Sequence, residues 1–373
     1  MADIYNSGFS RNNKRRRASS GKGRRSWLVA PDIFVWLMMV VLTAATIICT
    51  VTPHVEPERM GWLSLVALGA PIIYIFDLIV ALWWVVRGRW YNVAIASVAV
   101  VIGLFSVGRY YRIDPTRNPS SFVERRFVKA ISYNVANGKA EGIVDYVKRV
   151  NPDIIALQEF LIDVNEEWLK LGDSYRSTIS GATDFSCEII TRHRILRHGE
   201  IDSISRYTAN WADLFIKRSE DTVRVINLHL QSTSLRSADT QFIEEHEYLV
   251  DTASRSRISS IATRLCDNNV KRAEQARRIK RFIDSSPYPV IVCGDFNDVP
   301  LSYTYNNIAE GLNDTFRERG VGYAHTFNGF FNLMRIDYML VSDRVEVVTC
   351  DVDDTVHYSD HYPVICRLRM KKK

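Results

Sequence analysis

The first third of the chain contains three long apolar stretches separated by short polar segments. Residues 33–51 and 90–107 carry no charge, and residues 62–86 carry one acidic side chain, Asp77. The apolar core of a bilayer is about 30 Å thick, so a helix needs about 20 apolar residues to cross it. Three such stretches in succession predict three transmembrane helices within residues 27–108 rather than core helices of a soluble protein. We interpret Asp77 as a helix–helix contact; the alternative is a functional group inside the membrane.

The positions of the positive charges predict how these helices are oriented. Residues 1–26 contain eight Lys and Arg against one acidic residue, and the turn at 87–89 contains two arginines. Because basic segments stay on the cytoplasmic side, the tail 1–26 and this turn are expected inside the cell. Three crossings then place the chain after about residue 108 outside, and Arg109 and Arg112 are too few to reverse this. We expect a multi-pass protein of the cell (inner) membrane with an extracytoplasmic C-terminal domain.

Beyond residue 108 the apolar runs become short. Residues 109–126 have the Pro, Ser and Arg content of a linker. From 127 to 373, short apolar or alternating runs predict strands, and runs with helical spacing predict helices. The expected strands are 127–134, 153–159, 175–180, 186–190, 210–217, 222–231, 290–296, 335–342, 345–350 and 362–370. The expected helices are 139–150, a helix near 163–171, and most of 235–285. This mixture predicts an α/β domain with two sheets and helices packed outside them.

The segment 232–270 is long for a connection between predicted elements and carries clusters of charge. One hypothesis makes it a lid over a binding site. The other makes it a pair of surface helices without a role in the chemistry. The sequence favours neither hypothesis.

Charge and cysteine content exclude some classes of protein. Residues 1–26 carry +7 and residues 27–112 carry +1, so the net charge of +6 leaves −2 for the remaining 261 residues. A globally basic surface for nucleic acid is therefore not expected on the C-terminal domain, although a local basic groove stays open. The six cysteines form no CxxC pair and no zinc spacing. This argues against a disulfide scaffold without excluding a single bridge.

Polar side chains follow the apolar runs of several predicted strands. The stretch VIVCGDFNDVP at 290–300 ends a buried run with Gly294, Asp295 and Asn297. In an extended chain residues i and i+2 point the same way, so Asp295 and Asn297 would face one spot. Turn chemistry is the alternative, because Gly, Asp and Asn are also turn residues. Similar polar positions recur at Asn134, Glu159, His229, Asp337, Asp360 and His361. Because an unpaired buried carboxylate is costly, this recurrence favours one common site.

Six short motifs give the domain a family resemblance. They are SYNV (132–135), LQE (157–159), NLHL (227–230), GDFN (294–297), RIDY (335–338) and SDH (359–361). In this order, over about residues 127–369, they resemble the endonuclease/exonuclease/phosphatase superfamily. The resemblance implies a four-layered αββα sandwich with its site at one end of the paired sheets. The combination with N-terminal spans is similar to the teicoplanin-resistance-associated membrane proteins of bacteria, which implies a lipid-linked phosphate or pyrophosphate substrate.

The resemblance and the needs of phosphodiester hydrolysis together imply a metal site. Phosphoryl transfer uses a hard cation on a phosphoryl oxygen, an activated water and donors for the developing charge. Glu159 would bind Mg²⁺ or Mn²⁺, with Asn134 near the same ion or a phosphate oxygen and Asp360 completing the acidic cluster. Oxygen ligands without a Cys or multi-His set favour Mg²⁺ over Zn²⁺. The alternative for Asn134 is a strand-end hydrogen-bonding residue.

The resemblance also implies the acid–base groups. Asp295 would orient or deprotonate the attacking water, and Asn297 would donate to the phosphoryl oxygens. His361 would be the second acid–base or phosphate-stabilising group, oriented by Asp337. His229 would contact the scissile phosphate and assist the leaving group; the alternative is a buried core histidine.

These features predict a membrane-anchored, divalent-metal-dependent phosphohydrolase or phosphodiesterase acting outside the cytoplasm. Its expected partners are a phosphate-ester substrate, with a lipid-linked one favoured, and the membrane; no obligate protein partner is inferred. Substrate contacts are expected at His325 and Thr326, which precede RIDY. An extracytoplasmic nuclease is one alternative, weakened by the acidic domain because phosphate contacts drive nucleic-acid affinity. A non-catalytic binding protein is the other, and the complete set of candidate residues argues against it.

Overall fold

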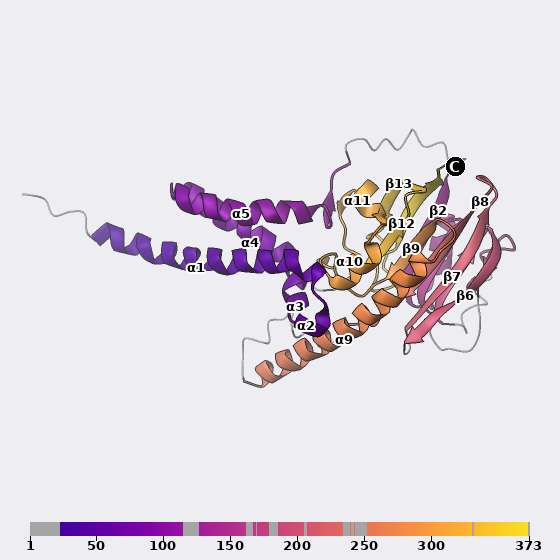
Figure 1. The fold of residues 1–373 in the computed structure, drawn as a ribbon, viewed down its shortest axis with the longest axis horizontal. Helices are drawn as coiled ribbons and strands as arrows, with labels where there is room; N and C mark the ends of the chain where they lie inside the picture. Colours follow the sequence, from indigo (N-terminus) through magenta and orange to yellow (C-terminus); the bar gives the residue numbers. More distant parts are fainter. Residues whose placement is uncertain are drawn as a thin grey trace, which may run out of the picture.

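The computed structural model describes residues 23–114, 127–161, 167–168, 170–178, 186–204, 207–233, 239, 242, 252–329 and 332–371. A helical unit projects from one side of a sheet-rich domain (Figure 1). The helical unit contains α1 (Gly23–Val51), η1 (Thr52–His54), α2 (Pro57–Met60), α3 (Leu63–Leu68), α4 (Ala70–Val86) and α5 (Trp90–Val107). The predicted tail 1–26 lies almost entirely outside the described residues.

Two of the three expected spans are helices of membrane length. By length and composition, the helices over Ala30–His54 and Trp90–Val107 are long and apolar enough to cross a bilayer. The second expected span, 62–86, is instead divided at Gly69 into α3 and the 17-residue α4. Pro71 in the first turn of α4 has no N–H to continue the preceding helix, which explains the break. The expectation of three membrane-length helices is therefore wrong for this segment.

Helices α1, α4 and α5 pack against one another along their length. Met39, Val80, Trp84 and Ala96 form a buried cluster between them. Thr46 Oγ1 on α1 donates a hydrogen bond of 2.5 Å to the buried Asp77 carboxylate on α4. The interpretation of Asp77 as a helix–helix contact is confirmed.

The domain is built on two six-stranded sheets. One sheet has the order β10-β12-β9-β8-β7-β6 and the other β13-β14-β2-β3-β5-β4. The strands of the first are β6 (Arg194–Ile204), β7 (Tyr207–Ile216), β8 (Asp221–His229), β9 (Val290–Asp295), β10 (Asn313–Asp314) and β12 (Asp337–Val341). Those of the second are β2 (Val128–Asn137), β3 (Ile154–Phe160), β4 (Arg176–Ser177), β5 (Ser186–Thr191), β13 (Val345–Val352) and β14 (Val364–Met370). The pairs β2–β3 and β8–β9 are parallel.

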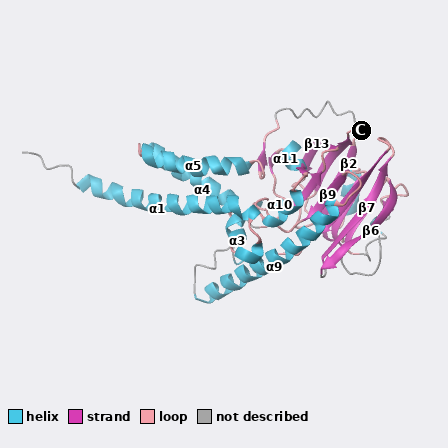
Figure 2. Ribbon diagram, viewed as in Figure 1, coloured by secondary structure: helices cyan, strands magenta, loops and turns pink. Residues whose placement is uncertain are grey.

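Helices cover the outer faces of both sheets. Apolar residues of the two inner faces form one core, which includes Ala156 of β3 and Val225 of β8. Helix α6 (Ile143–Val150) packs on the outer face of β2 and β3. Helices α9 (Thr252–Asp284) and α10 (Tyr303–Ala309) pack on the outer face of β8 and β9, and the short α11 (Thr315–Arg319) follows β10. Figure 2 shows α9 and α10 beside the sheet that contains β9. The predicted α/β class with two packed sheets is confirmed, and these elements stack as helix, sheet, sheet and helix.

Sequence patterns missed the strand β6. It lies at the edge of its sheet and carries Arg194, Arg197 and Glu200 among exposed positions. Charged side chains are common on edge strands because they discourage pairing with other chains, and they hide the apolar periodicity. The helix expected near 163–171 and the part of 235–285 before α9 lie largely outside the described residues.

The first residues of the expected linker are held against the domain. Strand β1 (Tyr111–Arg112) pairs antiparallel with β11 (Gly322–Tyr323). Arg109 Nη1 donates to the Pro300 carbonyl at 2.7 Å, and Arg335 Nη1 donates to the Arg109 carbonyl at 3.0 Å. Backbone and side-chain bonds thus fix the end of α5 on the domain. The rest of this segment, 115–126, lies outside the described residues.

The connection between α1 and α4 also contacts the domain. Arg277 Nη2 of α9 lies 2.5 Å from Glu58 Oε1 of α2. Leu65 of α3 packs against Ile261 and Leu265 of α9. The helical unit is therefore joined to the domain at the end where α1 and α5 finish and α4 begins.

Glu188 on β5 is a buried carboxyl group, and its ionisation is expected to make the stability of the domain depend on pH. Burial raises the pKa of this carboxyl to about 6, although Ser177 and Thr178 donate hydrogen bonds that favour its ionised form. A folded-state pKa above the unfolded value of about 4.3 means that ionisation destabilises the fold as pH rises through about 6. We expect Glu188→Gln, which keeps the acceptor oxygen, to raise the free energy of unfolding at pH 8 by about 2 kcal/mol.

At pH 4.5 the same substitution should change stability little, because the wild-type carboxyl is then protonated. Thermal unfolding of the full-length protein at both pH values measures the difference, with Glu200→Gln on the exposed edge strand as the matched control. A shift of equal size at both pH values would contradict the assignment.

Candidate active site

The site residues gather where neighbouring strands end. Asn134 and Glu159 lie near the carboxyl ends of the parallel strands β2 and β3. His229 and Asp295 are the last residues of the parallel strands β8 and β9. His229 and Asp295 are direct partners in the β8–β9 ladder. Because parallel strands deliver their carboxyl ends to one edge, four residues far apart in sequence meet at one end of the sandwich.

Unusual backbone angles and shifts of strand register occur at the residues that carry these side chains. Glu159 and Asn297 both have a φ of 52°, in the left-handed region that non-glycine residues seldom adopt. The ladders on both sides of β3 shift register next to Glu159. Gly294 has a φ of 132°, and a Cβ there would lie 2.0 Å from the Leu228 carbonyl oxygen. The GDFN motif therefore needs its glycine so that β9 can approach β8 closely.

Both carboxylate oxygens of Asp295 accept hydrogen bonds within the cluster. Its Oδ1 accepts from the Asn297 backbone N–H at 2.7 Å, and its Oδ2 accepts from Asn297 Nδ2 at 3.0 Å. Asn134 Nδ2 donates to the same Oδ2 at 3.1 Å. Burial and the neighbouring Asp337 carboxylate raise the pKa of Asp295 to about 6, against the effect of His361 and His229. A carboxyl with such a pKa can exchange a proton near neutral pH.

Glu159 faces the same space from the opposite sheet. Its Oε1 accepts from Asn134 Nδ2 at 3.1 Å and lies 3.4 Å from His229 Nε2. The Glu159 side chain is 36% exposed, whereas that of Asp295 is 1% exposed. Glu159 is thus the carboxylate of this group that solvent and solutes can reach.

His229 is held as a buried imidazole between two carboxylates. Its Nε2 lies 3.8 Å from Asp295 Oδ2. Burial lowers the pKa of His229, Asp295 opposes this effect, and the neighbouring His361 adds to it. The imidazole is therefore neutral at neutral pH.

His361 forms an ion pair with Asp337. Its Nδ1 lies 2.9 Å from Asp337 Oδ2, and its Nε2 lies 3.8 Å from Asp295 Oδ2. Asp337 in turn faces Asp295 in the β9–β12 ladder. Burial alone would lower the pKa of His361, but Asp337, Asp295 and Asp360 together raise it to about 10. The site therefore holds one neutral and one positively charged imidazole, each beside Asp295.

Two predicted substrate contacts lie beside the cluster rather than in it. Thr326 is fully buried, and its Oγ1 accepts from the backbone N–H groups of Ile336 and Asp337, both at 3.0 Å. It therefore holds the chain that enters β12. His325 Nε2 lies 3.6 Å from Asp354 Oδ2, away from the carboxylate cluster. Within the described residues, neither His325 nor Thr326 forms a hydrogen bond with Asp295 or Glu159.

Asp360 is exposed, and its Oδ1 accepts a hydrogen bond from Ser359 Oγ at 3.3 Å. Within the described part of the chain, no hydrogen bond or ion pair joins it to Asn134 or Glu159. Its predicted part in a metal site stays a prediction.

Two residues that support the site went unnoticed in the sequence. Gln158 Nε2 on β3 donates to Asn227 Oδ1 on β8 at 2.6 Å, which bonds one sheet directly to the other. Asn227 Nδ2 donates to the Leu157 carbonyl at 2.8 Å. Both side chains are buried next to site residues, in LQE and NLH. A polar residue pointing into the core one or two positions before a site residue is the signal that could have identified them.

The donors present fit a hard divalent cation. Asp295, Asp337 and His361 offer ligand atoms that all lie within 4.8 Å of one another. His361 Nδ1 and Asp337 already pair with each other, whereas Glu159 is accessible and offers a carboxylate. Asn134 turns its Nδ2 toward that carboxylate, and its Oδ1 accepts from the Ala136 backbone N–H at 3.1 Å, so Glu159 is the ligand of this pair that can meet a cation. Carboxylate and amide oxygens are the ligands that Mg²⁺ and Mn²⁺ prefer.

Sequence comparison identifies the family to which this two-sheet domain belongs. The model described as the Endonuclease/Exonuclease/phosphatase family matches residues 131–361. The chain belongs to this family. A second family model, described only as a domain of unknown function, matches residues 32–110. No curated protein matches the chain.

Three solved structures of similar fold each cover about two thirds of the chain. A family protein from Bacteroides thetaiotaomicron is 18% identical with a TM-score of 0.49, covering 66% of this chain and 98% of that chain. A mannosyl-6-phosphatase from the same organism is 18% identical with a TM-score of 0.47, covering 65% and 99%. TDP2 from D. rerio, complexed with a single-strand DNA product, is 16% identical with a TM-score of 0.48, covering 65% and 99%.

Proposed function

We propose that this protein is a membrane-anchored, divalent-metal-dependent phosphohydrolase or phosphodiesterase whose active site works outside the cytoplasm on a lipid-linked phosphate or pyrophosphate. The observation that carries the reaction class is the convergence of Asp295, Asn297 and His361 with Glu159 at one end of the sandwich. The resemblance to teicoplanin-resistance-associated membrane proteins is the reason for proposing a lipid-linked substrate.

The roles proposed for the residues follow from their contacts. Glu159 would hold Mg²⁺ or Mn²⁺, with Asn134 near the same ion or a phosphate oxygen, and a bound cation of this kind polarises a phosphoryl oxygen. Asp295 exchanges the proton of the attacking water, because its pKa is raised to about 6 and Asn297 fixes both of its oxygens. His361, held positively charged by Asp337, stabilises negative charge that develops on the phosphoryl group.

The contacts of the helical unit support a site close to the membrane. Leu68 of α3 packs in one apolar cluster with Val299, Met334 and Phe327. The Phe327 ring lies edge-on to the His361 imidazole, with centroids 5.2 Å apart. One apolar cluster thus connects the helical unit to a ring that contacts a proposed catalytic group. A site held this close to the bilayer encounters lipid-linked substrates at high effective concentration.

Topology is tested by a reporter fused after Lys373. We expect alkaline phosphatase to be active and green fluorescent protein to be dark at this position, because basic residues hold the N-terminus inside and we infer that the 17-residue α4, at the short end of the spanning range, crosses the bilayer together with α1 and α5. Fusions within the turn at 87–89 should show the opposite pattern and serve as the internal control. A fluorescent C-terminal fusion would place the domain in the cytoplasm and contradict the proposal.

Substrate class is tested by hydrolysis assays with the purified full-length protein and Mg²⁺. Bis-p-nitrophenyl phosphate, plasmid DNA and polyprenyl pyrophosphate are compared at equal phosphate concentration. We expect the polyprenyl pyrophosphate in mixed micelles to be hydrolysed with the highest kcat/KM. Faster cleavage of plasmid DNA would support a nuclease instead.

A further inference from the structure

The backbone of Glu159 departs from the regular strand that carries it. Its φ of 52° lies in the left-handed region, which a non-glycine residue keeps only where the surrounding structure fixes it. In the described ladders that join β3 to β2 and to β5, the residues on either side of Glu159 have partners and Glu159 has none in the β2 ladder, while the β5 ladder skips from Leu157 to Phe160. Strand pairing therefore does not fix this residue, and the contacts that do so come from outside the ladders.

The side chain of Asn227 on β8 holds the residues that precede Glu159. Asn227 is fully buried, and its Nδ2 donates to the Leu157 carbonyl oxygen at 2.8 Å and to the Glu188 carbonyl oxygen at 3.0 Å. Its Oδ1 accepts from Gln158 Nε2 at 2.6 Å. Both amide N–H groups and the amide oxygen of Asn227 are thus used. Through this one side chain, the opposite sheet fixes the two residues before Glu159.

These contacts act on Glu159 through its backbone. Within the described residues, the hydrogen bonds of the Asn227 side chain go to residues 157, 158 and 188, and none goes to the Glu159 carboxylate. His229 follows two residues later on the same strand, and its Nε2 lies 3.4 Å from Glu159 Oε1. Asn227 therefore ties the backbone before Glu159 to the strand that presents His229 opposite it.

Groups that orient a metal ligand affect metal binding although they do not contact the ion. We propose that Asn227 is a positioning residue: by bonding to Leu157 and Gln158, it fixes the left-handed backbone of Glu159 and so directs the Glu159 carboxylate toward the divalent cation. The inference rests on the proposed function, in which Glu159 holds Mg²⁺ or Mn²⁺.

Asn210 on β7 provides a matched control. It is the direct partner of Asn227 in the β7–β8 ladder and is also buried. Its Nδ2 donates to the Cys187 carbonyl oxygen at 3.0 Å and to Thr178 Oγ1 at 3.2 Å, so it links the same two sheets. Within the part of the chain that the structure describes, it makes no hydrogen bond to β3. Asn210→Ala therefore removes a bridge of the same kind without releasing the backbone next to Glu159.

Binding of Mn²⁺ to the full-length protein in detergent micelles, without substrate, tests the proposal. Electron paramagnetic resonance measures the free ion, so the dissociation constant is obtained independently of hydrolysis. We expect Asn227→Ala to raise this constant roughly 10- to 100-fold, the usual effect of removing a group that orients a metal ligand. Asn210→Ala should leave the constant nearly unchanged, and thermal unfolding should show that both variants fold and are destabilised.

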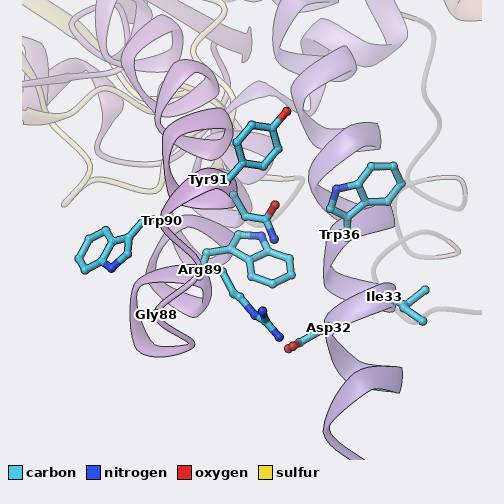
Figure 3. A pocket seen from close by; sticks show the side chains of 9 residues that line it. Asp32, Ile33, Trp36, Gly88, Arg89, Trp90 and Tyr91 are labelled. Carbon is cyan, nitrogen blue, oxygen red and sulfur yellow. The ribbon is translucent and has the colours of Figure 1, made fainter. Parts of the chain in front are cut away.

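The Asp32 carboxylate is not expected to add a second Mn²⁺ site. Asp32 of α1 lines a cavity next to the turn at 87–89 (Figure 3). Its carboxylate accepts two hydrogen bonds from Arg87, both of 2.8 Å, and Figure 3 shows the Arg89 guanidinium directed toward it. Two neighbouring positive charges oppose the binding of a cation there.

A double-mutant cycle with Glu159→Gln separates positioning from a general loss of structure. If Asn227 acts through the Glu159 carboxylate, Asn227→Ala should matter much less once that carboxylate is gone. We expect its effect on the Mn²⁺ dissociation constant to fall from at least about tenfold to less than about threefold. An undiminished effect of Asn227→Ala in the Glu159→Gln protein would contradict the proposal.

Gln158→Met is a milder variant, because it keeps the length of the side chain and removes one of the three hydrogen bonds of Asn227. We expect roughly tenfold weaker Mn²⁺ binding, at the lower end of the range for such groups. Unchanged binding in both Gln158→Met and Asn227→Ala, or equal effects of Asn227→Ala and Asn210→Ala, would overturn the positioning role and leave Glu159 as the proposed ligand. If Glu159→Gln itself binds Mn²⁺ as tightly as the wild type, the metal role of Glu159 in the proposed function fails, and this inference fails with it.

Discussion

Replacing Asp295 and His361 together is expected to cost little more activity than replacing either one alone. The two side chains lie 3.8 Å apart, and both are buried in one hydrogen-bonded cluster with Asp337 and Asn297. Residues that act on one transition state are strongly non-additive, so each of Asp295→Asn and His361→Gln should lower kcat by about three orders of magnitude or more. The double variant should lie within about tenfold of the worse single variant.

Single-turnover hydrolysis of bis-p-nitrophenyl phosphate by the four proteins measures this coupling. Asp343→Asn is the matched control, because Asp343 is a carboxylate at the turn between β12 and β13, at the other end of β12 from Asp337, and accepts from Asn313 Nδ2. Losses that multiply in the double variant would show that the two residues act independently. Circular dichroism of each variant separates lost chemistry from lost folding.

Glu159→Gln is expected to lower kcat/KM by about two to three orders of magnitude, the usual cost of losing one group that stabilises transition-state charge. Glutamine has nearly the same volume and can still accept from Asn134 Nδ2, so the fold should survive. The Mg²⁺ concentration for half-maximal activity should rise as well, because a neutral amide is a weaker ligand than a carboxylate. Glu310→Gln, an exposed change on the same domain, should leave both quantities unchanged.

A variant that keeps full activity at the same Mg²⁺ concentration would remove Glu159 from the metal site. Asp295→Asn would then be the next variant to examine for metal dependence, since Asp295 belongs to the compact group of donors with Asp337 and His361.

The strands that carry the site were predictable because they are buried on both faces. Runs such as VIVC at 290–293 and IIAL at 154–157 are apolar throughout, and their ends are marked by polar residues that buried strands rarely carry. The edge strand β6 was missed because its exposed charges hide its periodicity. The break at Gly69 was missed because composition alone does not show where a long apolar run divides into two helices.

That these polar residues gather at one end of the sandwich was largely predictable, and how they contact one another was not. Periodicity placed Asp295 and Asn297 on one side, but their mutual hydrogen bonds depend on the left-handed backbone of Asn297. The inward bond between Gln158 and Asn227 depends on the packing of two sheets, which no local pattern records. The docking of Leu68 near Phe327 likewise joins residues more than 250 positions apart.

Hydrolysis by sealed membrane vesicles tests the central claim most directly. Right-side-out vesicles carrying the full-length protein are given a phosphodiester substrate that cannot cross the bilayer, with Mg²⁺ and EDTA added to the outside in turn. We predict hydrolysis without permeabilisation, its loss in EDTA, its return with excess Mg²⁺, and a rate lower by about two to three orders of magnitude with Glu159→Gln. Hydrolysis that requires permeabilised vesicles, or that continues undiminished in EDTA, would contradict a metal-dependent active site outside the cytoplasm.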